Sequence, residues 1–173
     1  MILYHEDAPA LSEVIMERSH VTLSEEYLKT HLGTYSTNSP SELDCIPSST
    51  HTLIIRWIET YDPNITLAHL EIRKLVIAPY CCDQVTQFVL DGMSVLETVW
   101  FLCDSVHCKE CKEKENQNEC HIVNCPLLRQ VIIGYKCFFH CRVCEWRNLP
   151  SLQYLEFGDE SFFSAKRFEL KGD

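Results

Sequence analysis

A 24-residue internal repeat constrains the fold more than any other feature of this sequence. Leu128–Gly134 and Leu152–Gly158 share the pattern Leu-x-x-φ-x-φ-Gly, in which φ is an apolar residue, and the two segments lie about 24 residues apart. Earlier copies begin at Ile72 and Leu96, and the copy from Leu96 is longer because of an insertion in its polar, cysteine-rich half. The sequence therefore divides into repeats at 72–95, 96–127, 128–151 and 152–173.

The spacing of apolar residues within a copy predicts two short strands. Each copy opens with alternating apolar residues, which place the apolar side chains on one face of a strand. A second alternating pair follows later in the copy, as in Phe88 with Leu90, Cys144 with Trp146, and Phe168 with Leu170. One strand cannot bury its apolar face alone, but stacked copies form a parallel sheet over a continuous core. We expect a solenoid, that is, a coil with parallel strands on two walls.

The repeats resemble the leucine-rich repeat superfamily, in particular irregular short-repeat proteins of protists. The resemblance rests on Leu128–Gly134, on the Cys137-Phe138 unit and on the return segment Cys144–Pro150, and it covers residues 72–173. It implies a leucine-rich-repeat-like fold that binds a protein or another ligand, and it supplies no catalytic residues. The chain lacks a regular asparagine at the strand ends, so a standard asparagine ladder is not expected.

Residues 1–70 are interpreted as an N-terminal cap for the solenoid, which would occupy residues 71–173. A helical pattern extends over residues 9–33, with a capping box at Thr22–Glu25 and Gly33 as a stop signal. Residues 34–50 read as a polar linker, and the segment from His51 to Ile58 reads as a strand. Terminal repeats need a cover for the open end of their core. A separate interaction module is the alternative interpretation of this segment.

Composition and charge narrow the class of protein. Apolar residues make up 46% of the 173 residues, the net charge is −10, and the acidic excess lies in the first 71 residues. The absence of a basic patch argues against nucleic-acid binding. No apolar run is long enough for a membrane span, and the N-terminus lacks signal-peptide features. We therefore expect a cytoplasmic chain with free thiols and a protein partner.

The eleven cysteines raise the question of metal binding. In the insertion, Cys103, Cys108, Cys111 and Cys120 could form a zinc site, so a zinc-stabilised interaction module built on residues 103–125 is the alternative function. Adventitious thiols in a solvated loop are the other interpretation, and no further cofactor is indicated. Cys141 and Cys144 occupy repeat positions where small core residues suffice. A Cys137–His140 nucleophile pair lacks an activating partner or a substrate cleft in the sequence, so no enzymatic activity is expected.

A partner surface is predicted on the first strand of each repeat, where side chains between the core positions point outward. These residues form a partner-binding set that comprises Lys74, Val76, Trp100, Ile132, Tyr154 and Glu156. Val76, Trp100 and Ile132 would form an exposed apolar stripe with an aromatic anchor. Two alternatives remain open: that such residues simply suit strands, or that the N-terminal segment folds over them. Self-association through the uncapped C-terminal edge is a further hypothesis.

Overall fold

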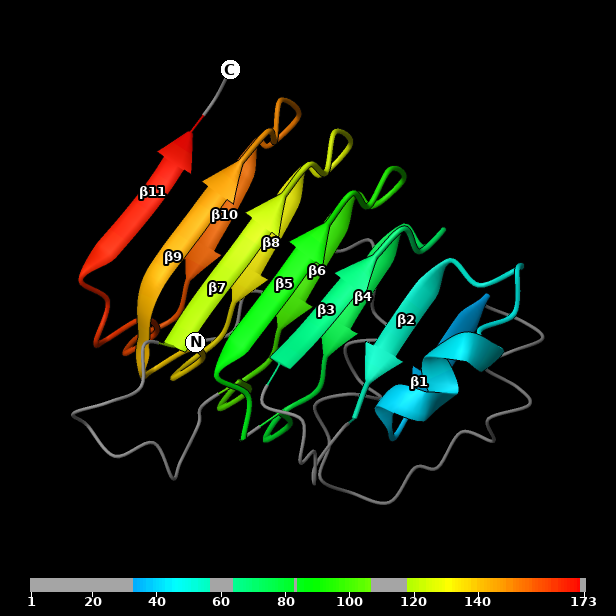
Figure 1. The fold of residues 1–173 in the computed structure, drawn as a ribbon, viewed down its shortest axis with the longest axis horizontal. Coiled ribbons are helices and arrows are strands. Elements are labelled where there is room, and N and C mark those ends of the chain that lie inside the picture. Colours follow the sequence, from blue (N-terminus) through cyan, green and yellow to red (C-terminus); the bar gives the residue numbers. More distant parts are fainter. Residues whose placement is uncertain (1–32, 57–63, 83, 107–117, 172–173) are drawn as a thin grey trace.

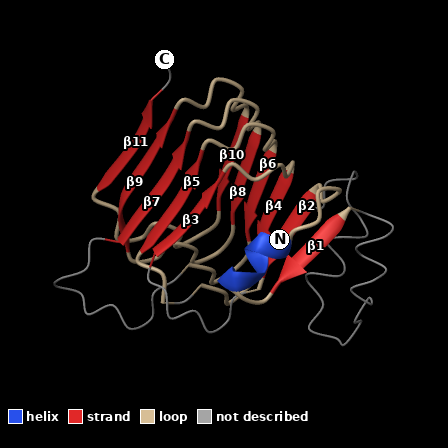
Figure 2. Ribbon diagram, turned by 45° about the vertical axis from the view of Figure 1, so that its right-hand side comes forward, coloured by secondary structure: helices blue, strands red, loops and turns tan. Residues whose placement is uncertain are grey.

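The chain forms two parallel β-sheets with almost no helix. A computed structural model describes residues 33–56, 64–82, 84–106 and 118–171 of the protein. Every strand pairing in these residues is parallel. The two sheets lie face to face, with one in front of the other in Figure 1 and side by side in Figure 2. This coarse architecture agrees with the prediction of parallel strands on two walls.

The first sheet has six strands in the order β1-β2-β4-β6-β8-β10. Their bounds are β1 (Thr34–Thr37), β2 (Thr52–Ile55), β4 (Lys74–Ile77), β6 (Thr98–Phe101), β8 (Gln130–Ile133) and β10 (Tyr154–Phe157). The second sheet has five strands in the order β11-β9-β7-β5-β3. Their bounds are β3 (Asn64–Ala68), β5 (Gln87–Asp91), β7 (Asn118–Val123), β9 (Cys141–Arg147) and β11 (Arg167–Lys171). From β2 onward, the described strands alternate between the two sheets along the chain.

The strand register pairs the residues that the sequence comparison places at equivalent positions. In the first sheet, Leu75 pairs with Val99, Val99 with Val131, and Val131 with Leu155. In the second sheet, Phe88 pairs with Cys120, Cys120 with Cys144, and Cys144 with Phe168. The longer copy therefore keeps its strands in register, and its additional residues fall between β6 and β7.

Left-handed backbone conformations recur at matching places in successive copies. The turn after the first-sheet strands contains two series of residues with positive φ: Tyr80, Asp104, Lys136 and Glu160, and then Cys82, Val106, Phe138 and Phe162. A third series follows the second-sheet strands at His69, Gly92, Asn124 and Asn148. Asparagine and glycine enter this conformation most readily, which explains their use in the third series.

A short side-chain ladder accompanies the third series, although the sequence did not lead us to expect an asparagine ladder. Asn124 Nδ2 donates to Asp91 Oδ1 at 2.7 Å, and Asn148 Nδ2 donates to Asn124 Oδ1 at 2.6 Å. The signal is weak in sequence because Gly92 occupies the place equivalent to Asn124, and the accepting oxygen comes from Asp91, one residue earlier. The parallel register brings these side chains together at the ends of β5, β7 and β9.

The core lies between the two sheets. Leu75, Val99 and Val131 of the first sheet and Phe88 and Trp146 of the second are fully buried there. Apolar burial of this kind contributes roughly 1.5–3 kcal/mol per side chain. The buried residues form one continuous cluster that extends from β2 to β9.

Residues 34–50 differ from the polar linker that the sequence predicts. Thr34–Thr37 form the edge strand β1, and Pro40–Cys45 form the 3-10 helix η1. Threonine and tyrosine fit a pleated, half-buried surface, and hydrogen bonds to β2 fix the strand, with Tyr35 beside Leu53. The strand predicted from His51 is confirmed as β2 within its described residues, and β2 and β3 join the same sheets as the later repeats. The helix expected over residues 9–33 lies almost entirely outside the described residues.

Within the part of the chain that the structure describes, we find no helix with the length and apolar character that a bilayer span requires.

Replacing Gly158 by alanine is expected to destabilise the protein by about 1–3 kcal/mol. A Cβ atom at this turn would lie 2.6 Å from the carbonyl carbon of Gly134 and 2.6 Å from the backbone nitrogen of Tyr135. Both contacts are with backbone, so the neighbouring turn must shift to relieve them. Urea denaturation measures the change in the free energy of unfolding. The matched variant Asp159→Ala, at an exposed position of the same turn, should stay within about 0.5 kcal/mol of the parent. Equal losses in both variants would contradict the close-packed turn.

Candidate functional site

The outward face of the first sheet carries the predicted partner residues in two rows. The first row comprises Thr34, Thr52, Lys74, Thr98, Gln130 and Tyr154, and the second row comprises Ser36, Ile54, Val76, Trp100, Ile132 and Glu156. These residues alternate with the core residues of the same strands, so they point away from the core. The register therefore brings all six predicted partner residues onto one face.

The second row is buried on β2 and β4 and becomes more exposed from β6 to β10. Ile54 is 2% exposed and Val76 is fully buried, although neither belongs to the core between the sheets. Trp100 and Ile132 are half-buried, and Glu156 is exposed. The prediction of an exposed stripe is therefore wrong for Val76, which lies between the larger side chains of Ile54 and Trp100. The accessible part of the face extends over β6, β8 and β10.

Lys74 and Trp100 form the most distinctive contact on this face. The Lys74 ammonium nitrogen lies 3.2 Å from the centroid of the Trp100 ring. Burial of the side chain lowers the pKa of Lys74 to about 8. Loss of water on burial favours the neutral amine, whereas the ring face favours the charged ammonium. An acceptor from a partner would stabilise the charged form.

Two buried polar atoms of the second row have unused hydrogen-bonding capacity. Among the described residues, no group accepts a hydrogen bond from Trp100 Nε1 and none bonds to Ser36 Oγ. An unsatisfied buried donor costs about 1–3 kcal/mol. Trp100 Nε1 can only donate, so the group that suits it is a carbonyl or carboxylate oxygen.

At the other end of the face, Tyr154 and Glu156 form an exposed pair. The Tyr154 hydroxyl donates to Glu156 Oε2 at 2.6 Å. This hydrogen bond, together with the negative charge of Glu156, raises the pKa of Tyr154. Tyr154 is 48% exposed, so its ring presents apolar surface with a polar tip, as is common in protein interfaces.

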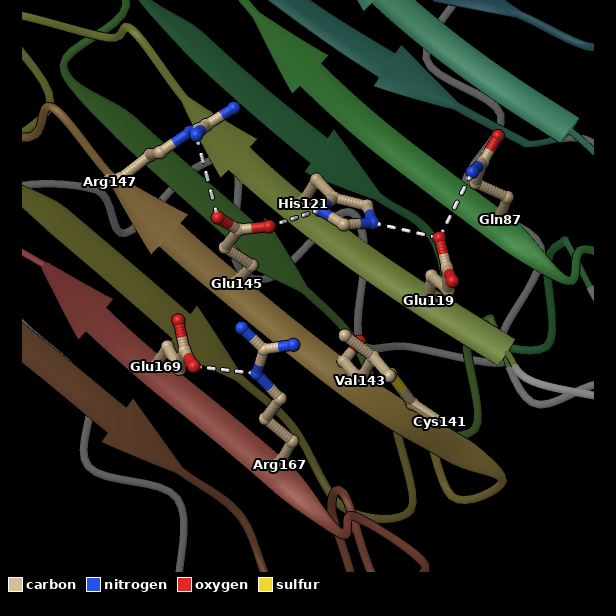
Figure 3. A network of polar contacts seen from close by, with 9 residues as sticks. All are labelled: Gln87, Glu119, His121, Cys141, Val143, Glu145, Arg147, Arg167 and Glu169. Atoms are coloured by element: carbon tan, nitrogen blue, oxygen red, sulfur yellow. Dashed lines mark hydrogen bonds and ion pairs between the residues drawn. The ribbon is translucent and has the colours of Figure 1, made fainter.

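The outward face of the second sheet carries a polar network instead (Figure 3). His121 Nε2 lies 3.0 Å from Glu119 Oε2, and its Nδ1 lies 3.5 Å from Glu145 Oε2. Gln87 also donates to Glu119 at 3.2 Å, and Arg147 lies 3.7 Å from Glu145. The hydrogen bond from His121 is the main reason that the pKa of Glu119 is lowered.

This network links three neighbouring strands of the second sheet. The sequence pattern did not predict that His121 would join two carboxylates. Strand register brings them together, because His121 pairs with Glu145 across β7 and β9. Exposed or half-exposed ion pairs of this kind contribute at most about 1 kcal/mol each. We interpret the network as a structural feature of the sheet surface.

The predicted zinc ligands are not brought together in the described residues. Cys108 and Cys111 lie outside these residues, and Cys103 is half-buried after β6. The assignment of Cys120 to a polar loop is wrong: it is a fully buried core residue of β7, between Phe88 and Cys144 in the register. Burial raises the pKa of Cys120 well above its usual value. In the described part of the chain, no group of three or more histidine, cysteine or acidic residues is arranged to hold a metal ion.

The environment of Cys137 does not suit a nucleophile. Its side chain is fully buried, and its thiol donates to the Leu102 carbonyl at 3.0 Å. Burial raises the pKa of Cys137 to about 11, whereas a reactive cysteine has a lowered pKa. Cys141 and Cys144 are also buried in the core, in agreement with their interpretation as packing residues.

No protein-family model, curated protein or solved structure matches this sequence.

Proposed function

We propose that the chain is a non-catalytic scaffold that binds a protein partner on the outward face of the first sheet, over β6, β8 and β10. The observation that carries the proposal is Trp100, whose half-buried ring lies on the outward face against the Lys74 ammonium. Tryptophan and tyrosine dominate the binding energy of many protein interfaces. Trp100 lies on β6 and Tyr154 on β10, and Ile132 of the intervening strand β8 pairs with Trp100 on one side and with Glu156 on the other.

We further infer that the two sheets are the walls of a leucine-rich-repeat-like solenoid. The alternation of strands between the sheets, the preserved register and the recurring left-handed residues all support this inference. Such stacked coils present an extended surface on which the equivalent residues of successive coils lie side by side. A surface of this form suits an elongated partner segment.

The chemistry of the face defines the kind of segment that fits. An apolar side chain would pack against Trp100 and Ile132, and a carbonyl or carboxylate oxygen would accept from the Lys74 ammonium. Because burial lowers the pKa of Lys74 to about 8, a carboxylate of the partner would raise this pKa and strengthen its own binding. We therefore propose an apolar peptide segment with an acidic side chain as the partner.

Selection from a peptide-display library against the full chain tests the proposal. We expect the recovered peptides to contain apolar and acidic residues and to lose at least about tenfold in affinity with Trp100→Ala or Ile132→Lys, as is typical of interface anchors. Isothermal titration calorimetry with one recovered peptide measures the change.

Val89→Lys is the matched control for Ile132→Lys. Val89 is a half-buried outward residue of β5 on the opposite sheet, so the same charge is introduced on the other wall. The affinity should be unchanged in this variant. Peptides that bind equally well to the Trp100 variant, or that lose affinity only with the Val89 variant, would refute the proposed face.

A further inference from the structure

The end of the two sheets formed by β10 and β11 exposes residues of the core type. By register, Phe157 is equivalent to Ile133, Phe168 to Cys144, and Leu170 to Trp146. The three earlier residues are at most 1% exposed, whereas Phe157, Phe168 and Leu170 are 44%, 42% and 54% exposed. These three side chains therefore form an apolar end surface, which is distinct from the partner face of the first sheet.

Two of these rings are also in contact across the interior. The ring centroids of Phe157 and Phe168 lie 5.6 Å apart in an edge-to-face arrangement, and Trp146 lies beneath both. Around them, β10 and β11 are the terminal strands of their sheets, as Figure 1 shows for β11 in red. The outer edge of each strand is not paired with any described strand. The end surface thus combines open strand edges with an aromatic centre.

We propose that this end surface binds the same surface of a second copy of the chain, around a two-fold axis that passes close to Phe168 and Phe157. Such an axis would pair β11 with the partner copy's β11 in an antiparallel direction. Phe168 would then lie opposite Phe168 of the partner subunit, and the exposed rings of both copies would bury one another.

The charges on the outward side of β11 support this arrangement. Arg167 Nε donates to Glu169 Oε1 at 2.6 Å within one copy. In an antiparallel pair centred on Phe168, Arg167 of each copy lies directly opposite Glu169 of the partner subunit. The strand is therefore complementary to itself in charge, whereas like charges directly opposite would repel.

The opposite end of the sheets does not offer an equivalent surface. Its core residues Leu53, Ile65 and Leu67 are at most 3% exposed, and Tyr35 is 9% exposed. In a head-to-tail stack, the apolar end of one copy would therefore contact the opposite end of the next copy, where the core residues are not accessible. When two identical apolar ends pair, the apolar end surface of each copy is buried and the assembly closes at a dimer.

A charge exchange between two variants provides the sharpest test. Arg167→Glu places only acidic residues at positions 167 and 169, and Glu169→Arg places only basic residues there. Each variant alone should dimerise at least about tenfold more weakly than the parent, because two attractive pairs become repulsive. An equimolar mixture should recover dimers that contain one chain of each kind. Sedimentation equilibrium of the full chain over about a hundredfold range of concentration measures both results.

Phe168→Lys removes the apolar centre and should leave a monomer with an unchanged circular dichroism spectrum. Leu127→Lys is its control, since Leu127 is 43% exposed at a turn away from this end, and it should dimerise like the parent. A parent chain that stays monomeric throughout the range would overturn the proposal. So would a dimer that is insensitive to Phe168→Lys, or variants whose mixture fails to dimerise. None of these outcomes bears on peptide binding at Trp100, so the two proposals fail separately.

Discussion

Phe101→Ala is expected to remove a large share of the protein's stability. Phe101 is fully buried, and its ring lies 5.2 Å from the ring of Phe88 and 4.7 Å from that of Phe138, measured between centroids. The cluster joins β6 of the first sheet, β5 of the second sheet and the turn between β8 and β9. Truncation of a buried phenylalanine costs about 3–5 kcal/mol, which is a large share of a typical stability of roughly 5–15 kcal/mol. Thermal and urea denaturation followed by circular dichroism measure the loss.

Phe163→Ala is the matched control for this variant. Phe163 also stacks on another ring, that of Phe139 at 5.0 Å, but it is 71% exposed. The same change in side chain should therefore cost less than about 1 kcal/mol, because little apolar surface leaves the solvent. A loss of similar size in both variants would mean that the Phe88–Phe101–Phe138 cluster does not hold the sheets together.

Alkaline pH is expected to destabilise the protein strongly, because burial keeps several thiols protonated in the folded state. Burial raises the pKa of Cys125 and of Cys137 from 9.0 to about 11. The unfolded chain therefore releases these protons first, so the stability that the protonated thiols supply is complete below pH 9 and is lost as the pH rises through 11. A difference of two pKa units corresponds to roughly 2–3 kcal/mol for each thiol.

The effect of one thiol can be isolated with Cys137→Ala. Urea denaturation at pH 7.5 and at pH 10.5 gives the loss of stability between the two conditions. We expect this loss to be about 1–3 kcal/mol smaller in Cys137→Ala than in the parent. Cys45→Ala changes an exposed cysteine and should show the same loss as the parent. A loss that is equal in all three proteins would show that Cys137 titrates alike in the folded and unfolded chains.

Much of the strand pattern could be predicted because it depends on local alternation. Phe88 with Leu90, and Cys144 with Trp146, mark the second-sheet strands, and the spacing between copies specifies the register that the structure has. Cys120 shows where such reasoning fails. Its sequence neighbours are polar and include other cysteines, which suggested a metal ligand. Its equivalence with Phe88 and Cys144 was the signal that would have placed it in the core, but the insertion in its copy obscured that alignment.

The outward face of the first sheet also shows what alternation along a strand can predict and what it cannot. Alternation along each strand correctly placed Lys74, Val76, Trp100, Ile132, Tyr154 and Glu156 on one side of the sheet. It could not predict that Val76 would be buried, because exposure depends on what lies beside and above a side chain rather than on its direction. The contact between Lys74 and Trp100 was equally hidden, since 26 positions separate them and only the parallel register makes them neighbours.

The sequence by itself determined the period of the fold, the direction of each strand's apolar side and the pairing of equivalent residues. These properties follow from the spacing of apolar residues, which acts over a few residues and repeats from copy to copy. The tertiary structure alone decided which outward residues are accessible and which polar side chains meet, as His121 does with Glu119 and Glu145. It also decided that residues of the core type are exposed on β10 and β11. Those properties depend on how the strands and sheets pack and on where the sheets end, because a residue's environment there comes from residues distant in the sequence.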